Sequence, residues 1–165
     1  MASWADLERA EPEFSARVRE RLDAHVHKAI ATLRRRGGPR ISGIETIWYE
    51  GDLWFGSMPA AVKAADLLRD PRFALHSGSD DPPGWEGDAK LAGRAVEVTD
   101  HDLVGRVLAA RNPQQSEPDE PIDPGDLHLF RADLDEVVWT GLDEEREKLL
   151  IEHWHPGRGL ERIQR

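Results

Sequence analysis

The sequence contains no cysteine, which excludes disulfide bonds, thiol chemistry and zinc sites built on cysteine. No apolar run approaches the roughly 18 residues that a transmembrane helix needs. The first residues, MASWADLERAEPEF, lack the basic and then apolar layout of a signal peptide. Together these absences predict a cytoplasmic protein that has no membrane partner.

Basic residues are in the minority. Lysine and arginine number 22 against 32 aspartate and glutamate residues, a net charge of −10, which argues against nucleic acid as a partner. The segment 28–72 is nevertheless locally basic. A positive stretch in a negative protein favours an anionic small molecule as ligand. A chain of 165 residues with 39% hydrophobic residues predicts one domain with a real core.

Helical spacing of apolar residues appears in three places. Residues 3–24 form the first helical segment, which Pro12 interrupts. A second helix is predicted over 59–69, with proline at its first position. A third is predicted from Thr99 to Ala110, where Thr99 and Asp102 resemble a capping box. The predicted strands cover 29–33, 41–49, 53–57, 72–77, 89–98, 127–142 and 148–154.

Tight turns join neighbouring strands. Glu50-Gly51-Asp52 predicts a hairpin, and Gly93 predicts a bend or bulge inside its strand. These features favour a mainly β (α+β) fold: a six- to seven-stranded antiparallel split β-barrel with a few short helices and an N-terminal helix. No GxGxxG motif follows the first strand, so a Rossmann site is not expected.

We expect one domain over residues 1–165. It has a helical extension at 1–26 and a long polar loop at 111–126, and no internal repeat. The basic tail after residue 154 is not assigned to an element.

The start of the helix at 59–69 is a candidate phosphate site. Backbone N–H groups and the helix dipole attract an anion there, and Lys63 adds a positive charge one turn in. Ser57 and Met58 lead into this helix start. The alternative is an ordinary solvated helix lysine. The sequence favours a phosphate-bearing, flavin-type cofactor.

Four motifs carry a family resemblance: PRISGIE (39–45), GDLWFGSM (51–58), RDPRFALHS (69–77) and GDAKLAGRA (87–95). With Lys63, their order and spacing resemble the pyridoxamine 5'-phosphate oxidase-like family, the FMN-binding split β-barrels. The resemblance runs from about residue 27 to 98 and more weakly from 127 to the end.

The resemblance implies a homodimer that binds FMN, or in some branches the deazaflavin coenzyme F-420, at the interface. Ser57 and Lys63 fall on the family's phosphate-binding pattern. Val62 stands where the true oxidases usually carry arginine, which keeps F-420 open as an alternative. The cofactor-binding residues that the resemblance implies are Arg40, Ile41, Ser42, Gly43, Ser57, Met58, Lys63 and Lys90.

The implied function is an FMN-dependent oxidoreductase that transfers hydride to or from an unknown small molecule. The alternatives are an F-420-dependent reductase and a non-catalytic flavin- or haem-binding protein. No catalytic residue is nominated, because a flavin carries its own chemistry and the protein supplies binding and orientation.

Each candidate also has a structural explanation. Arg40 and Ser42 share one face of their strand, which could meet the cofactor or face solvent. Gly43 could let a flat ring approach the backbone, or could mark a bulge. Lys90 could reach the cofactor from a neighbouring strand, or be a surface lysine.

Two histidine pairs have the spacing that places both rings on one side of a strand, as in a metal site. They are His25 with His27 and His153 with His155. No acidic or cysteine residue stands at a matching spacing, so we expect solvated or core histidines and no metal site. The run 34–36 consists of three arginines, which we interpret as a solvated turn.

Overall fold

The computed structural model describes residues 1–111, 123, 125 and 127–165. Most of the loop expected at 111–126 therefore lies outside the described residues. The helices are α1 (Trp4–Ala10), α2 (Pro12–Asp23), α3 (Val62–Arg69) and α4 (His101–Ala109). The strands are β1 (Lys28–Leu33), β2 (Pro39–Ile44), β3 (Thr46–Tyr49), β4 (Asp52–Ser57), β5 (Arg72–His76), β6 (Asp88–Val98), β7 (His128–Leu142), β8 (Leu149–His155) and β9 (Gly159–Gln164).

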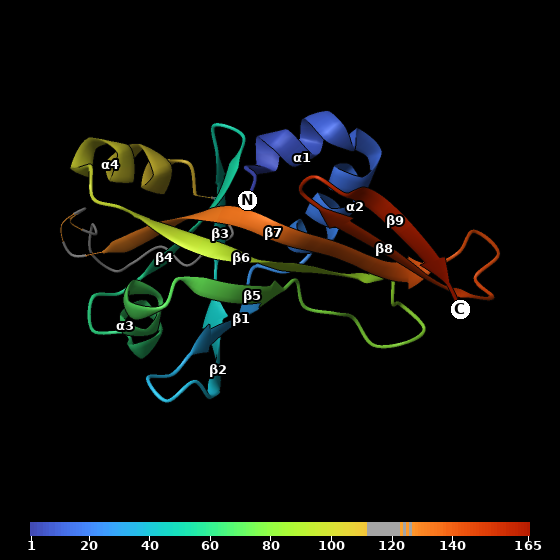
Figure 1. Cartoon of the computed structure of the whole chain (residues 1–165), viewed down its shortest axis with the longest axis horizontal. Coiled ribbons are helices and arrows are strands. Elements are labelled where there is room, and N and C mark those ends of the chain that lie inside the picture. The colour runs from blue at the N-terminus through green and yellow to red at the C-terminus, as the bar shows by residue number, and fades with distance from the viewer. Residues whose placement is uncertain (112–122, 124, 126) are drawn as a thin grey trace.

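All strand pairs are antiparallel, in the order β2-β1-β5-β6-β7-β4-β3, and β8 and β9 extend from β7. The long strand β7 divides the sheet (Figure 1). Its first residues pair with β4 and its last residues pair with β8, while β6 runs along its other edge. The two ends of the sheet lie side by side, because β2 and β3, at opposite ends of the order, are joined by Glu45 alone. This architecture confirms the predicted antiparallel split barrel.

Helices α1 and α2 cover one side of the long strands, and α3 lies on the other side (Figure 1). The two N-terminal helices bury Trp4, Leu7, Phe14, Val18 and Leu22 in the main core, which confirms the predicted helical segment and its break at Pro12. A smaller cluster joins α4 to β3 and β4. Its buried members are Ile47, Trp54, Val104, Val107 and Leu129.

The described residues form nine strands, not the six or seven predicted. The expected strand 41–49 begins at Pro39 and breaks at Glu45, where the chain passes from one end of the sheet to the other. The tail forms β9, which pairs with β8 after a turn whose two glycines, Gly157 and Gly159, have positive φ. This strand was missed because its sequence is short and charged.

Both later helices begin after the predicted positions. Pro59 lies in a turn, and α3 starts at Val62 after the extended residue Ala61. Asp100, not Thr99, is the N-cap of α4, since its carboxylate accepts hydrogen bonds from the N–H groups of Asp102 and Leu103.

The hairpin and the bulge were predicted correctly. Glu50 and Gly51 both have positive φ, as a two-residue type I′ hairpin requires. At Gly93 the register of β6 on β7 shifts, and an added Cβ atom would lie 1.9 Å from the Asp133 carbonyl oxygen. Among the described residues no helix is long and apolar enough to span a membrane.

Candidate functional site

A cavity of about 350 Å³ lies where β2, β4, α3 and the end of α4 meet. Four of the eight predicted cofactor residues line it: Gly43, Ser57, Met58 and Lys63. Its other lining residues are His27, Ile44, Glu45, Ile47, Gly56, Leu108, Arg111 and Leu127. The volume lies in the range typical of small-molecule sites.

Lys63 supplies a cation to this cavity. It lies in the first turn of α3, and its Nζ donates a 2.7 Å hydrogen bond to the carbonyl oxygen of Gly43 on β2. The side chain is half-buried, and burial lowers the pKa of Lys63 below its usual value of 10.5. The ammonium group has therefore lost water, and no ion pair to a carboxylate of the described residues replaces it.

Ser57 places a hydroxyl group in the same wall. The residue is 4% exposed at the end of β4, and its Oγ has no hydrogen-bond partner among the described residues. Leaving a buried hydroxyl unpaired costs free energy, so such a group is a candidate for ligand binding. The cavity thus contains a buried donor and a desolvated cation, both suited to an anion.

Sequence reasoning missed a second cation in the lining. Arg111 follows α4, and its Nη2 lies 3.9 Å from Oε2 of Glu45, the residue between β2 and β3. His27 Nδ1 lies 3.5 Å from Oε1 of the same carboxylate. No local motif marks Arg111, since its place in the site depends on how α4 packs on β3 and β4.

Glycines leave room at the wall. An added Cβ atom on Gly43 would meet nothing within 4 Å, and one on Gly56 would make ordinary contact with Leu127 at 3.5 Å. Backbone without side chains lets a flat group approach closely. Gly43 is not the site of a bulge, because its pairing with Ala29 continues the regular register of β1 and β2.

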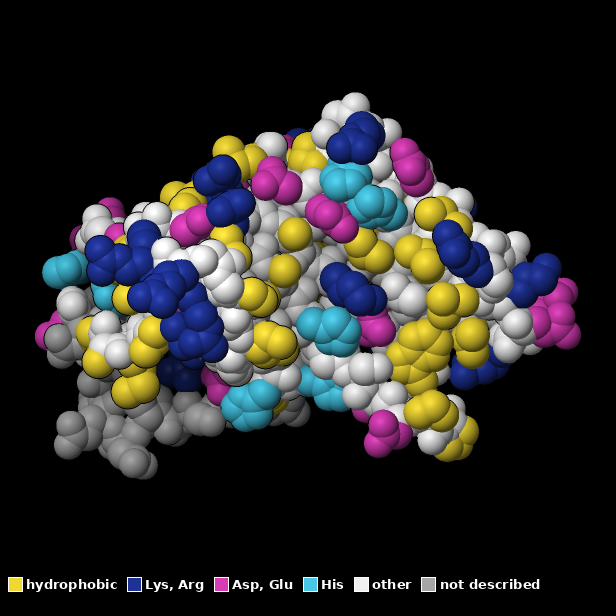
Figure 2. Space-filling view, turned by 60° about the horizontal axis from the view of Figure 1, so that its bottom comes forward, with side chains coloured by type: hydrophobic (Ala, Val, Ile, Leu, Met, Phe, Trp, Pro, Cys, Tyr) yellow, Lys and Arg dark blue, Asp and Glu magenta, His cyan; other side chains and the backbone are white. Residues whose placement is uncertain are grey.

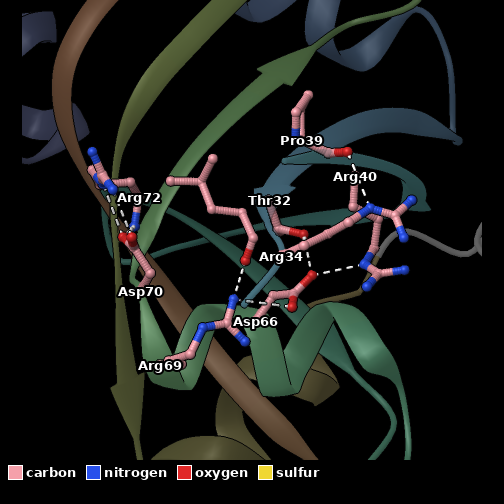
Figure 3. A network of polar contacts seen from close by, with 9 residues as sticks. Thr32, Arg34, Pro39, Arg40, Asp66, Arg69, Asp70 and Arg72 are labelled. Carbon is pink, nitrogen blue, oxygen red and sulfur yellow. Dashed lines mark hydrogen bonds and ion pairs between the residues drawn. The ribbon is translucent and has the colours of Figure 1, made fainter. Parts of the chain in front are cut away.

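Arg40 is not among the residues that line the cavity. Its Nε donates to Oδ2 of Asp66 on α3 at 2.7 Å, and Thr32 Oγ1 and Arg69 also donate to that carboxylate (Figure 3). Burial is the largest single influence on the pKa of Asp66, and it raises that pKa. The three hydrogen bonds together have the larger effect, so the pKa of Asp66 lies below 3.8. Arg40 therefore fastens α3 to the sheet. Ser42 shares the face of Arg40, as predicted, and likewise does not line the cavity.

Ile41 and Lys90 line a different hollow of about 440 Å³, on the side of the sheet opposite the core. Cross-strand pairing places Ala29, Ala31, Ala74 and Ala92 on this side, which we call the alanine face. Lys90 donates to Asp88 and, at 3.2 Å, to Thr140 Oγ1. The structure thus separates these two residues from the cavity of Ser57 and Lys63.

Charge is unevenly distributed over the surface. Figure 2 shows basic side chains gathered at the end of the molecule that carries α3. Arg34, Arg35 and Arg36 are exposed in the turn between β1 and β2 at this end. In a protein with a net charge of −10, this region is one whose local charge suits an anion.

The sequence pattern of pyridoxamine 5'-phosphate oxidase matches residues 14–139, which include every strand around the cavity. The chain belongs to the pyridoxamine 5'-phosphate oxidase-like family. This membership confirms the predicted resemblance. No curated protein sequence matches the chain.

Solved structures share the fold of this family member at low identity. PhzG from Burkholderia lata 383, in complex with tetrahydrophenazine-1-carboxylic acid, has a TM-score of 0.61 and 14% identity, over 93% of this chain and 86% of PhzG. A pyridoxamine 5'-phosphate oxidase-related, FMN-binding protein from Nostoc punctiforme PCC 73102 has a TM-score of 0.60 and 15% identity, over 93% and 95%. A heme-binding protein from Mycobacterium smegmatis has a TM-score of 0.59 and 15% identity, over 90% and 87%.

The residues present fit the phosphate group of FMN, the cofactor common in this family. Ser57 Oγ, which has no hydrogen-bond partner in the described part of the chain, can donate to a phosphate oxygen. Lys63 can add its charge at the same wall, and Arg111 lines the cavity as well.

Proposed function

We propose that the protein binds FMN in the cavity of Ser57 and Lys63 and acts as an oxidoreductase on a small molecule. The buried hydroxyl of Ser57 carries the proposal, because it has no partner among the described residues and lines the same cavity as the desolvated Lys63. Bound FMN supplies hydride transfer at its isoalloxazine ring. The chain's own residues bind and orient: Ser57 Oγ and Lys63 Nζ hold the phosphate, and Gly43 and Gly56 leave space for a flat group.

We further propose that the working form is a homodimer that covers the alanine face. Ile41 is 78% exposed on this face. Met58, which lines the cavity, is 75% exposed, and Val62, the first residue of α3, is 56% exposed. Large apolar side chains that are exposed to solvent favour an interface. A second copy would also shield the cavity from water, as hydride transfer requires.

The experiment is an FMN titration of the full chain, followed by quenching of flavin fluorescence. We expect one FMN per chain and the mass of a dimer in solution. Lys63→Ala should weaken binding at least about 10-fold, the loss of one charged hydrogen bond. Lys148→Ala is the matched control, because Lys148 is exposed in the turn between β7 and β8 and should bind as the wild type does.

Coenzyme F-420 and haem are titrated in parallel. Binding of F-420 alone would assign the deazaflavin chemistry, and binding of haem alone would assign haem binding without flavin chemistry. Binding of none of the three would refute the cofactor proposal. Once FMN is bound, its bleaching by NADH or NADPH without oxygen tests turnover. Failure with every donor would leave a flavin-binding protein that is not an oxidoreductase.

A further inference from the structure

Two histidines of β8 and one glutamate of β7 gather on the side of the sheet that carries the alanine face. His153 and His155 alternate along β8, so their rings project from the same side, with centroids 4.2 Å apart. Glu136 Oε1 lies 3.2 Å from His153 Nε2. One ligand atom from each of the three residues lies within 4.8 Å of the others. Atoms this close can share one ion at the usual ligand distances of roughly 2.0–2.2 Å.

A backbone hydrogen bond sets the tautomer of His155. Its Nδ1 lies 2.8 Å from the carbonyl oxygen of Asp135, which can only accept a hydrogen bond. Nδ1 therefore carries the proton, and Nε2 keeps its lone pair. Histidines that bind metal ions almost always make such a hydrogen bond from the second ring nitrogen.

The second observation concerns the Nε2 atom of His153. This atom is shielded from solvent and has no aligned hydrogen-bond partner among the described residues, although the Glu136 carboxylate is 3.2 Å away. A buried nitrogen that makes no hydrogen bond to the carboxylate oxygen beside it is left unsatisfied. An ion bound between this nitrogen and the Glu136 carboxylate would satisfy the nitrogen.

The surface around this cluster leaves space for further ligands. Glu161 of β9 stands directly opposite His153, so its side chain leaves the same side of the sheet. An open hollow of about 520 Å³ borders Glu136 and His155 and leaves room for water ligands. None of the three cluster residues lines the cavity of Ser57 and Lys63.

We propose that Glu136, His153 and His155 bind one divalent transition-metal ion, for which zinc is the probe. Two imidazoles and one carboxylate form a ligand set that suits zinc and its neighbours, and not magnesium or calcium. The absence of an acidic residue at matching sequence spacing does not count against this site, because Glu136 comes from the neighbouring strand. The site is independent of the proposed flavin chemistry.

The test is a calorimetric titration of the full-length, chelator-treated protein with Zn²⁺, compared with Mg²⁺. We expect one Zn²⁺ per chain, no binding of Mg²⁺, and a zinc-dependent rise in melting temperature. Glu136→Gln, His153→Gln and His155→Gln should each lower zinc affinity at least about 10-fold, because each substitution removes a proposed ligand. Melting curves in chelator show whether each variant still folds.

The matched control is His128→Gln. His128 Nδ1 lies 2.8 Å from Glu97 Oε1, a histidine–carboxylate pair between β7 and β6 that has no second imidazole. This variant should bind zinc as tightly as the wild type. Zinc binding that survives all three cluster substitutions, or that His128→Gln lowers equally, would overturn the proposal, as would the absence of stoichiometric binding.

Discussion

The side-chain nitrogen of Lys63 donates a 2.7 Å hydrogen bond to the carbonyl oxygen of Gly43, which joins the start of α3 to the end of β2. This bond satisfies one of the three donors of the ammonium group. The other donors can face a ligand in the cavity that both residues line. The lysine is thus held in place before an anion arrives, which lowers the entropic cost of binding.

FMN affinity should fall as the pH rises through the alkaline range. Burial lowers the pKa of Lys63 in the free protein, so the charged form of this lysine destabilises the fold. This destabilisation decreases as the pH rises above the lowered pKa and the lysine loses its proton. A bound phosphate favours the charged form and raises the pKa again. Between the free and the bound pKa, binding takes up a proton, which calorimetry in buffers of different ionisation enthalpy measures.

The control is Lys63→Arg, because arginine stays charged throughout this range. Its FMN affinity can be lower than that of the wild type, but it should lack the lysine-linked part of the pH dependence. Equal proton uptake in the two proteins would contradict the assignment of the phosphate to Lys63.

The hydroxyl of Ser57 should cost stability and support binding. Ser57→Ala removes a buried hydroxyl that has no partner among the described residues, so the free energy of unfolding should stay equal or rise by up to about 1 kcal/mol. FMN affinity should fall about 10-fold, because a hydrogen bond to the phosphate is lost. Urea unfolding and flavin titration measure the two effects separately.

Ser77→Ala is the matched comparison. Ser77 is fully buried, but its Oγ donates to the Gly78 carbonyl oxygen at 2.7 Å and accepts from the Ala89 N–H at 3.0 Å. Its loss should lower stability by about 1–2 kcal/mol and leave FMN affinity unchanged. If both serines behaved alike, the unpaired hydroxyl would have no special role in binding.

Short-range sequence patterns predicted the elements that depend on neighbouring residues. Pro12 starts α2 as a proline at the first helical position, and Glu50-Gly51 forms the predicted hairpin. Ser57 and Lys63 lie a few positions apart, so their common place in the cavity also follows from local sequence. The family resemblance added Gly43 and Met58, which line the same cavity.

The remaining features depend on contacts between distant segments. The alternation of side chains along a strand predicted the face on which Arg40 lies. It did not predict its partner Asp66, which comes 26 residues later on α3. Arg111 reaches the cavity through the packing of α4, and Glu136 reaches the histidines through the register of β7 on β8. No spacing rule in a single sequence contains these relations. The break at Glu45 likewise follows from closure of the barrel.

Asp66 should stabilise the attachment of α3, because its carboxylate is nearly buried and accepts hydrogen bonds from Arg40, Thr32 and Arg69. Asp66→Asn should lower the free energy of unfolding by about 2 kcal/mol at neutral pH, a typical value for a lost charged hydrogen bond. The pKa of Asp66 lies below that of an unfolded aspartate, about 3.9, so its stabilisation is present above that pH and disappears as the pH falls through the lowered pKa. Urea unfolding of both proteins from neutral to acidic pH should therefore give two stability curves that converge in acid.

Asp70→Asn serves as the comparison, since Asp70 pairs with Arg72 at 2.6 Å on the surface, where solvent weakens the interaction. The pKa of Asp70 is about 2, so it titrates in the same acidic range, but its loss should change stability far less. A gap between wild type and Asp66→Asn that stays constant down to the most acidic pH would show that the carboxylate charge is not what fastens α3 to the sheet.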